Sequence, residues 1–289
     1  MKILFIISNI HHKNLNSILK CKKINFSFVN SVNDINNWDL SIFDAVISTC
    51  DPVDVVKYPN TKFIFGPHFS IFPDNKLDII KGNNAVYNSL SDWVINLWKL
   101  WPICDNLNLI KLPFGVDTEK FCEIKPINER ENVIIYFKHR NPDDLLFIQN
   151  FLINKSIPYI IFSYNTKYNE DDYIKQLQNS KYCIWVDAHE SQGFALQEAL
   201  SCNVPLLVWN VTSMNQEYGQ NYDDLQATTL AYWDDCCGDF FYNKDEINDK
   251  FNLFISKIND YNPRQFILDN LSVEACEDKL IRTIENIII

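Results

Sequence analysis

The sequence predicts an α/β protein with two parallel-sheet domains. Short apolar runs recur along the 289-residue chain, with helical or turn segments between them. Several of these runs are continuous rather than alternating, which is typical of strands buried on both faces of a sheet. Strands that alternate with helices favour parallel sheets, and the length is about that of two domains.

The first half of the chain contains the candidate strands of the first domain. The opening apolar run is too short for a secretory signal and is followed at once by His11, His12 and Lys13, so we interpret it as a strand. We expect helices at Leu15–Cys21 and Ser91–Leu100. The expected strands are Ile3–Ser8, Asn25–Val29, Phe43–Ser48, Lys62–Phe65, Ala85–Tyr87 and Leu107–Leu112.

The second half repeats this alternation and ends in a helical tail. The expected strands are Asn132–Phe137, Pro158–Ser163, Tyr182–Val186 and Leu206–Trp209. The expected helices are Asp143–Asn154, Asp171–Asn179, Phe194–Ser201, Asp245–Ile258, Asn262–Leu271 and Ser272–Ile287. The pattern therefore predicts a second parallel sheet.

A change in composition near residues 121–131 marks the break between the halves. This segment is polar and contains Pro126. Residues 1–125 hold 13 Lys and Arg against 12 Asp and Glu, whereas residues 126–289 hold 13 against 25, a net charge of −12. We expect one domain over residues 1–124 and a second over residues 125–265. We expect residues 266–289 to form a helix that crosses back to the first domain.

Charge and cysteine content exclude some classes of protein. The net charge of −11 disfavours a surface that wraps nucleic acid, although a few converging Lys or Arg could still bind a small anion. The nine cysteines form no Cys-x-x-Cys pair, so we expect them to be reduced and structural. Since no run approaches the ~18 apolar residues of a membrane span, we expect a soluble, cytoplasmic protein.

The most informative stretch runs from Asp187 to Pro205 and reads as strand, loop, helix and strand. Gly193 opens the helix, so unpaired backbone N–H groups and the helix dipole face the loop, which suits a phosphate. Glu190 lies in the loop and Glu198 lies about a turn and a half into the helix. Two carboxylates separated in this way suit hydroxyl groups at two ends of one ligand.

This stretch resembles the retaining glycosyltransferases of the GT-B fold, family 4 in particular. Their hallmark is two Glu separated by seven residues, followed by Ala and, after a short gap, by Pro and a strand. The matching residues here are Glu190, Glu198, Ala199 and Pro205. The resemblance implies that the two domains are Rossmann-like and face each other across a cleft. Residues 1–124 would bind the acceptor, and residues 125–265 would bind the nucleotide-sugar.

The resemblance also implies roles for the residues of this stretch. Glu190 would lie at the hydroxyls of the donor sugar as a catalytic residue, and Glu198 would hold the ribose of the nucleotide. The backbone of Gly193, Phe194 and Ala195 would meet the diphosphate. Two further segments, Leu112–Phe121 and Ala85–Trp93, match the family in the right order, so that the resemblance covers roughly residues 60–285.

Histidines in the first half are candidates for the transfer site. His68 follows the strand Lys62–Phe65, and in the family a His in the corresponding loop lies near the donor sugar and diphosphate. We therefore expect His68 to be catalytic. His11 and His12 follow the first strand, where the family usually has a Gly-rich acceptor loop, and we place them on the acceptor side.

Two bases follow the first strand of the second half. The family places an Arg and a Lys near this point to neutralise the diphosphate, although Lys138 and Arg140 lie closer together than is usual. Two bases at a strand end of an acidic half are a plausible diphosphate clamp. With this clamp and without a convincing Asp-x-Asp, we expect no metal and no other cofactor.

The resemblance thus implies a retaining, metal-independent hexosyl- or pentosyltransferase of glycan biosynthesis. It would move a sugar from a UDP- or GDP-sugar to a glycan, a lipid-linked acceptor or another hydroxyl. Alternatives are a nucleic-acid base glucosyltransferase, which the charge disfavours, and a non-catalytic nucleotide-sugar-binding module. Four lysines after the first strand raise a further possibility, weak peripheral contact with an anionic membrane. They are Lys13, Lys20, Lys22 and Lys23.

Overall fold

The computed structural model describes residues 1–166 and 168–289 of the chain, which form two compact units. Unit 1 consists of Met1–Gly115 and Leu271–Ile289, and unit 2 consists of Val116–Asn270. Both ends of the chain therefore belong to unit 1. Domain boundaries were predicted after residues 124 and 265, whereas the units divide after residues 115 and 270.

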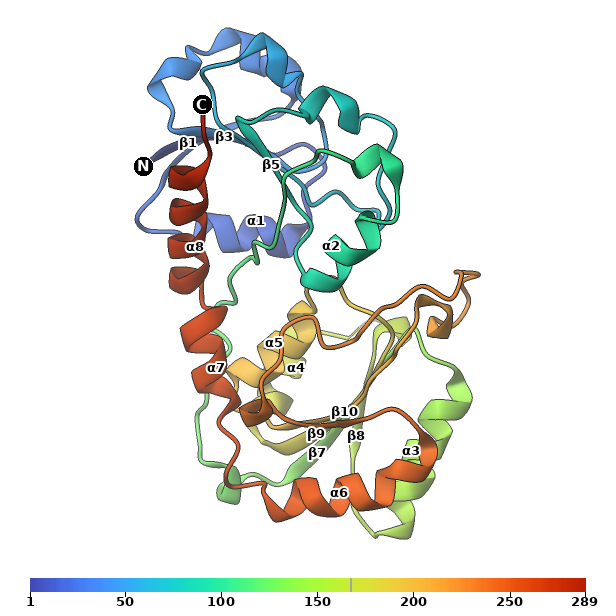
Figure 1. Ribbon diagram of the computed structural model, residues 1–289. Helices are drawn as coiled ribbons and strands as arrows, with labels where there is room; N and C mark the ends of the chain where they lie inside the picture. Colours follow the sequence, from blue (N-terminus) through green and yellow to red (C-terminus); the bar gives the residue numbers. More distant parts are fainter. Residues whose placement is uncertain (167) are drawn as a thin grey trace. The chain divides into compact units, whose positions relative to one another are not determined.

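Unit 1 is built on a parallel sheet of six strands within the described residues, in the order β2-β1-β3-β4-β5-β6 (Figure 1). The side chains of Ile3–Ile6 in β1 are completely buried, because the strand has neighbours on both sides and covered faces. The strands are β1 Lys2–Ile6, β2 Asn25–Val29, β3 Ala45–Ser48, β4 Phe63–Phe65, β5 Ala85–Asn88 and β6 Leu109–Ile110.

Three helices accompany this sheet, α1 (His12–Leu19), α2 (Asp92–Trp98) and α8 (Val273–Asn286). A buried carboxylate ties α8 to the start of the chain. Glu277 accepts hydrogen bonds from the backbone N–H groups of Lys22, Lys23 and Ile24, at 3.1, 2.6 and 3.0 Å. Three donors that would otherwise be unsatisfied are thereby paired with the C-terminal helix.

Gly115, in the segment Leu112–Phe121, lies where the chain has no room for a side chain. A Cβ atom at this position would lie 2.4 Å from the Cα of Val273, the first residue of α8. Its N–H also donates to the Ser17 hydroxyl of α1 at 2.6 Å. Gly115 therefore allows the chain to pass closely between α1 and α8 before it enters unit 2.

Unit 2 contains a parallel sheet of five strands within the described part of the chain, in the order β11-β10-β9-β7-β8. The strands are β7 Asn132–Lys138, β8 Ile160–Ser163, β9 Ser180–Asp187, β10 Leu206–Trp209 and β11 Gly238–Phe241. The helices are α3 Pro142–Asn154, α4 Glu170–Gln178, α5 Phe194–Ser201, α6 Ile247–Ser256 and α7 Pro263–Asn270.

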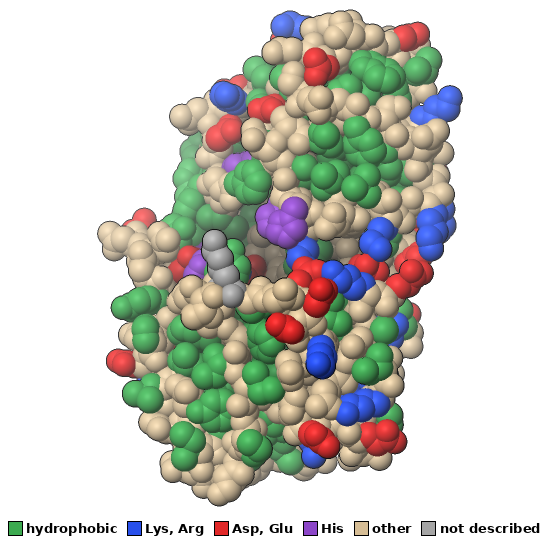
Figure 2. Space-filling model, turned by 180° about the vertical axis from the view of Figure 1, so that it is seen from behind, with side chains coloured by type: hydrophobic (Ala, Val, Ile, Leu, Met, Phe, Trp, Pro, Cys, Tyr) green, Lys and Arg blue, Asp and Glu red, His purple; other side chains and the backbone are tan. Residues whose placement is uncertain are grey.

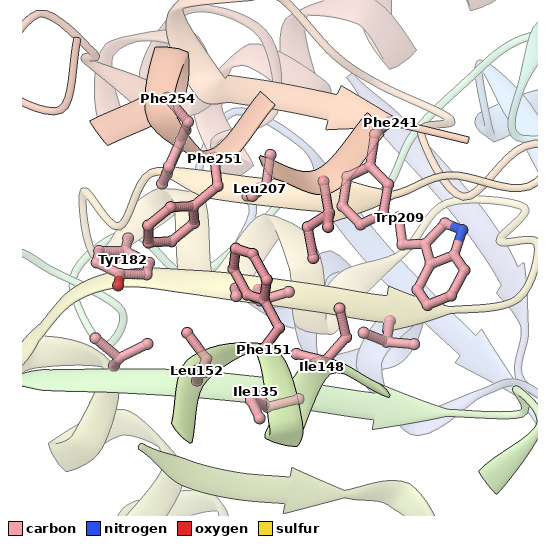
Figure 3. Close-up of a cluster of buried hydrophobic side chains, with 14 of the residues drawn as sticks. Ile135, Ile148, Phe151, Leu152, Tyr182, Leu207, Trp209, Phe241, Phe251 and Phe254 are labelled. Atoms are coloured by element: carbon pink, nitrogen blue, oxygen red, sulfur yellow. The ribbon is translucent and has the colours of Figure 1, made fainter. Parts of the chain in front are cut away.

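Helices α3 and α6 cover one face of this sheet (Figure 3). Phe151 of α3 meets Phe251 of α6 edge to face, with ring centroids 5.1 Å apart. Both helices pack onto inward residues of β7, β9 and β10 such as Tyr182. On the opposite face, Tyr136 and Trp185 stack at 3.9 Å, and the hydroxyl of Tyr173 in α4 donates to the backbone of α5.

The predicted α/β class with two parallel sheets is confirmed, and the expected strands and helices are present with ends shifted by a few residues. Strand β11 was not expected. Its four residues, Gly-Asp-Phe-Phe, are too few to show a period, and they follow a long polar segment. All nine cysteines are free thiols.

The surface of the described residues mixes both signs of charge. On the face in Figure 2, Lys and Arg side chains lie beside Asp and Glu side chains. Ion pairs among the described residues include Lys111–Asp92 and Lys250–Asp239. No helix in residues 1–166 or 168–289 combines the length and apolar character needed to cross a membrane.

Candidate active site

Two predicted site residues meet at the carboxyl edge of the unit 2 sheet. Strands β7 and β9 are parallel neighbours whose register places Lys138 opposite Asp187, the last residue of each strand. The chain then turns, and the ammonium of Lys138 forms an ion pair with the carboxylate of Glu190. Their side chains are 19% and 18% exposed, so the pair is largely enclosed but still reachable from solvent.

The carboxyl group of Asp187 completes this cluster, and only 2% of the residue is exposed. Burial raises the pKa of Asp187 well above its usual value, and the neighbouring Glu190 adds to the rise against the opposing effect of Lys138. Asp187 is therefore neutral over a wider pH range than an exposed Asp. In that form it can donate a hydrogen bond to Glu190.

The pKa values of Glu190 and Lys138 are shifted in favour of the charged forms, unlike the pKa of Asp187. Burial alone would raise the pKa of Glu190, but the Lys138 ammonium outweighs it and holds the pKa below its usual value. For Lys138, burial acts to lower the pKa, and the Glu190 and Asp187 carboxyl groups outweigh it, so that the pKa is raised. The charged forms of Glu190 and Lys138 are thus favoured, whereas burial favours the neutral, hydrogen-bond-donating form of Asp187.

Helix α5 begins directly beside this cluster. Gly193 is its N-cap with φ at +82°, a left-handed conformation that favours glycine, and no side chain caps the helix from that position. A Cβ atom there would make only ordinary contacts with Glu190, so the backbone angle is the reason for glycine. Phe194 and Ala195 follow, both half-buried. The N–H groups of this first turn are suited to an anion.

Glu198 lies farther along α5 and is only 4% exposed. Its carboxylate is thus enclosed by unit 2 itself in this structure, close enough to Tyr173 and Cys202 to contribute to the raised pKa of both groups. Helix α5 spans the residues expected for it, so Glu198 lies within this helix as predicted. A role of Glu198 on a ribose stays a prediction.

Arg140 is not exposed with Lys138, contrary to the expected clamp. His139 between them has φ at +49°, which turns the chain so that the two side chains enter different surroundings. The Arg140 guanidinium is 4% exposed and donates to the carbonyls of Asp187 and Trp209 and to the carboxylate of Asp144. These contacts join β9, β10 and α3. A role of Arg140 on a diphosphate stays a prediction.

A second charged group beside the cluster was missed by the sequence analysis. Glu217 lies between two histidines, 3.2 Å from His139 Nδ1 and 3.4 Å from His189 Nε2. Burial lowers the pKa of His189, although Glu217 opposes the shift. The two histidines adjoin Lys138 and Glu190 in the sequence, which is the signal that could have pointed to them. Glu217 comes from the segment between β10 and β11 and carried no such signal.

That segment is attached to the carboxyl edge of the sheet by its backbone as well. The N–H of Tyr218 donates to the carbonyl of His139 at 2.8 Å, and the N–H of Glu190 donates to the carbonyl of Thr228 at 3.1 Å. Asn210 accepts from the N–H and hydroxyl groups of residues 229 and 228, both at 2.9 Å. The loop that carries Glu190 is therefore held in place from two directions.

The predicted histidines of unit 1 lie at the carboxyl edge of its own sheet. The ring of His68 contacts the Tyr87 hydroxyl through Nδ1 and the carbonyl of Phe72 through Nε2, at 2.8 Å for the latter. Both ring nitrogens are thus engaged within unit 1. His11 and His12 are exposed, with ring centroids 4.5 Å apart, and His11 caps α1 by accepting from the N–H of Lys13.

The lysines near the start of the chain do not form a purely basic patch. Lys22 lies 3.7 Å from Glu274 and Lys23 lies 2.5 Å from Asp278, both in α8. Helix α8 is distant in sequence, so this neutralisation was not visible in the charge pattern. Of the described residues, no group of three or more His, Cys, Asp or Glu could hold a metal ion.

Comparison with known proteins gives a likeness in fold. No protein-family model matches the chain, and no curated protein sequence matches it. The chain is similar to the solved structure of sucrose-phosphate synthase from Thermosynechococcus elongatus, with a TM-score of 0.50 and 9% identity, over 84% of this chain and 73% of that one. This likeness shows the fold, the two-domain α/β architecture of the GT-B glycosyltransferases.

Two other solved structures are similar with lower TM-scores. One is a GtfA/B complex, with a TM-score of 0.47 and 13% identity over 78% of this chain and 53% of that one. The other is WaaG, a glycosyltransferase involved in lipopolysaccharide biosynthesis, with a TM-score of 0.49 and 12% identity over 99% and 100% of the two chains.

Proposed function

We propose that the chain is a glycosyltransferase that takes a sugar from a nucleotide-sugar bound to unit 2 and transfers it to a hydroxyl acceptor. The observation that carries this proposal is the Lys138–Glu190 ion pair beside Gly193, at the carboxyl edge of a parallel sheet. Parallel α/β sheets bind ligands at this edge. The GT-B fold and the two-Glu motif support the same activity.

The diphosphate of the donor would replace Glu190 as the partner of Lys138. A diphosphate is a stronger competitor for the Lys138 ammonium than a single carboxylate, because it presents more charge and more acceptor oxygens. Once Lys138 turns to the diphosphate, the Glu190 carboxylate is available to the hydroxyls of the donor sugar. Asp187 would hold Glu190 in place through its hydrogen bond. The N–H groups of Gly193, Phe194 and Ala195 would receive the remaining phosphate oxygens.

Charge on the leaving diphosphate would be stabilised without a metal ion. Lys138 and the first turn of α5 supply the positive potential there. Arg140 is outside this proposal, because its guanidinium is engaged inside unit 2. Glu198 would hold the ribose after a local opening that exposes its carboxylate. Retention of the anomeric configuration follows from the family resemblance and is part of the proposal.

Unit 1 would bind the acceptor, a glycan or a lipid-linked saccharide. His68, His11 and His12 lie at the carboxyl edge of its sheet, where a parallel sheet presents ligands. Since both ring nitrogens of His68 are engaged, it would orient the loop after β4, and it would donate to a ligand only after releasing the carbonyl of Phe72.

Two measurements on the full-length chain test this proposal. The first is thermal unfolding with UDP-, GDP-, ADP- and dTDP-sugars, in which a donor at 100 times its dissociation constant stabilises the folded state by about 2.7 kcal/mol. The second is release of nucleoside diphosphate from the stabilising donor, with and without EDTA. Binding without any turnover would identify a non-catalytic binding module. Turnover that EDTA abolishes and Mg²⁺ or Mn²⁺ restores would contradict the metal-independent site.

A further inference from the structure

Glu217 connects the two loops that carry the Lys138–Glu190 ion pair. Its Oε1 lies 3.2 Å from Nδ1 of His139, and its Oε2 lies 3.4 Å from Nε2 of His189. His139 follows Lys138 directly, and His189 precedes Glu190 directly. Each oxygen of one carboxylate therefore contacts the chain neighbour of one member of the ion pair.

The carboxylate of Glu217 is itself held in one place. Its side chain is only 11% exposed. It follows a short turn in which Ser213 and Gln216 form a capping box. Met214 in this turn is completely buried, and its N–H donates to the carbonyl of Leu225 at 2.8 Å. A carboxylate on such a fixed base can determine where its own contacts lie.

The two histidines are packed against aromatic rings as well as against Glu217. His139 has φ at +49°, a conformation that a residue other than glycine keeps only where its surroundings hold it. Its ring lies edge to face with Tyr164 at 5.4 Å, and the ammonium of Lys138 lies 5.1 Å from the centre of the same Tyr164 ring. The ring of His189 lies edge to face with Tyr222 at 5.8 Å. Contacts of Glu217 with these packed rings can therefore fix the backbone of both loops.

Donor binding would create a need for this connection. In the proposed function, the diphosphate replaces Glu190 at the Lys138 ammonium, so the direct link between the two loops opens. The paired register of β7 and β9 ends at Lys138 and Asp187, so the ladder between these strands does not extend to the residues that follow. Glu217 contacts both loops from a third segment and takes no part in the exchange of partners. Its contacts can persist while the ion pair is open.

We propose that Glu217 is a positioning residue of the donor site, which holds the two histidines so that Lys138 and Glu190 keep their separation when the donor parts their side chains. This inference rests on the proposed function and assigns Glu217 no contact with the donor. A misplacement of about 1 Å can slow a reaction about a hundredfold. Loss of Glu217 should therefore lower kcat more than it raises KM.

The test is steady-state release of nucleoside diphosphate by the full-length chain, with the donor that thermal unfolding identifies. Glu217→Ala should lower kcat at least about tenfold and change the KM for the donor less. Glu217→Gln should restore most of the activity, because an amide of the same length offers an oxygen and N–H groups to the two imidazoles. Glu217→Asp keeps the charge but is one methylene shorter, so it should not restore the activity. Asp224→Ala is the matched control, since Asp224 is exposed in the same segment.

A second measurement needs no substrate. The N–H of Glu190 donates to the carbonyl of Thr228, and that of Tyr218 donates to the carbonyl of His139. Hydrogen exchange should become faster in Glu217→Ala over residues 138–141 and 188–191, whereas β10 keeps its protection. The Asp224→Ala control should exchange as the native chain does.

The inference is overturned if Glu217→Ala leaves either kcat or the exchange of these residues unchanged. It is also overturned if Glu217→Asp restores activity and Glu217→Gln does not, because the charge of Glu217 and not its contacts would then matter. A native chain that releases no nucleoside diphosphate from any of the four donors would instead contradict the proposed function, and the inference would fail with it.

Discussion

Lys138 and Glu190 form an ion pair of opposite charges, and both belong to the proposed donor site. Each holds the pKa of the other away from neutrality, so both stay charged although their side chains are mostly enclosed. Breaking such a pair by removing one partner leaves the other charge poorly compensated. A ligand that brings its own negative charge keeps the Lys138 ammonium compensated, because it replaces Glu190 there.

The first residue-scale prediction is that Lys138→Met weakens donor binding. Loss of a charge-assisted contact to the diphosphate should cost about 1.5–3 kcal/mol. Calorimetry with the donor found by thermal unfolding measures the effect. Lys181→Met is the control, because Lys181 is exposed on β9 and lies outside the cluster. Equal donor affinity in the Lys138 variant and the control would remove Lys138 from the site.

The second residue-scale prediction concerns Asp187 and pH. Its folded pKa is raised by burial, so its favourable contribution to stability is present at low pH and is lost as pH rises from 3.8 through the folded pKa. Asp187→Asn cannot titrate and should therefore lose less stability over that interval. Urea unfolding at a series of pH values shows the difference between the two curves. Parallel curves would mean that Asp187 has an ordinary pKa in the folded chain.

Glu190 acts in the opposite direction in the same experiment. Its folded pKa is lowered, chiefly because Lys138 outweighs burial, so its contribution is present above pH 4.5 and is lost as pH falls through the folded pKa. The Asp187→Asn variant should still lose this contribution to stability as the pH falls, because it retains Glu190. The two carboxyl groups can therefore be separated by the side of the pH curve that changes.

At the scale of elements, the sequence pattern predicted those features that depend on residues close together in the chain. Helix α5, its glycine N-cap and the position of Glu190 beside it could be predicted, since each depends on neighbours in the sequence. The burial of Arg140 could not, because it depends on the left-handed conformation of His139 and on carbonyls from two other strands. Glu217 was hidden for a similar reason. Glu217 lies in the segment between β10 and β11, whose sequence shows neither a helical nor a strand period.

The element-scale prediction compares two glycines with the same backbone angle. Gly193 and Gly219 both have φ at +82°, but only Gly193 caps α5, and Gly219 has open space around it. An alanine at either position should cost roughly 1–2 kcal/mol of left-handed strain. Gly193→Ala should also weaken donor binding, because relief of the strain would move the first turn of α5. Chemical unfolding and calorimetry test the two effects, and donor affinity that falls equally in both variants would contradict the prediction.

At the scale of the whole molecule, the order of the chain explains how unit 1 is assembled. Its sheet comes from the first part of the chain, whereas α8 comes from the last, after unit 2 is complete. Glu274 and Asp278 of α8 form ion pairs with Lys22 and Lys23. The ammonium of Lys62 donates a hydrogen bond to the carbonyl of Ile284 at 2.7 Å. Contacts between such distant segments have no local signature, so the lysine cluster looked basic in the sequence.

The whole-molecule prediction is that Glu277→Ala destabilises unit 1 and leaves unit 2 largely unchanged. The substitution removes the acceptor of three backbone N–H groups at the junction of α8 with residues 22–24. The N–H of Ile24 is buried, whereas those of Lys22 and Lys23 are partly buried. A buried donor without a partner costs about 1–3 kcal/mol, so a loss of about this size is expected. Hydrogen exchange should then speed up in β1, β2 and α8 while β7 and β9 keep their protection. Glu274→Ala is the control, since Glu274 forms only an exposed pair with Lys22. Equal loss of protection in β7 and β9 would mean that the two units unfold together.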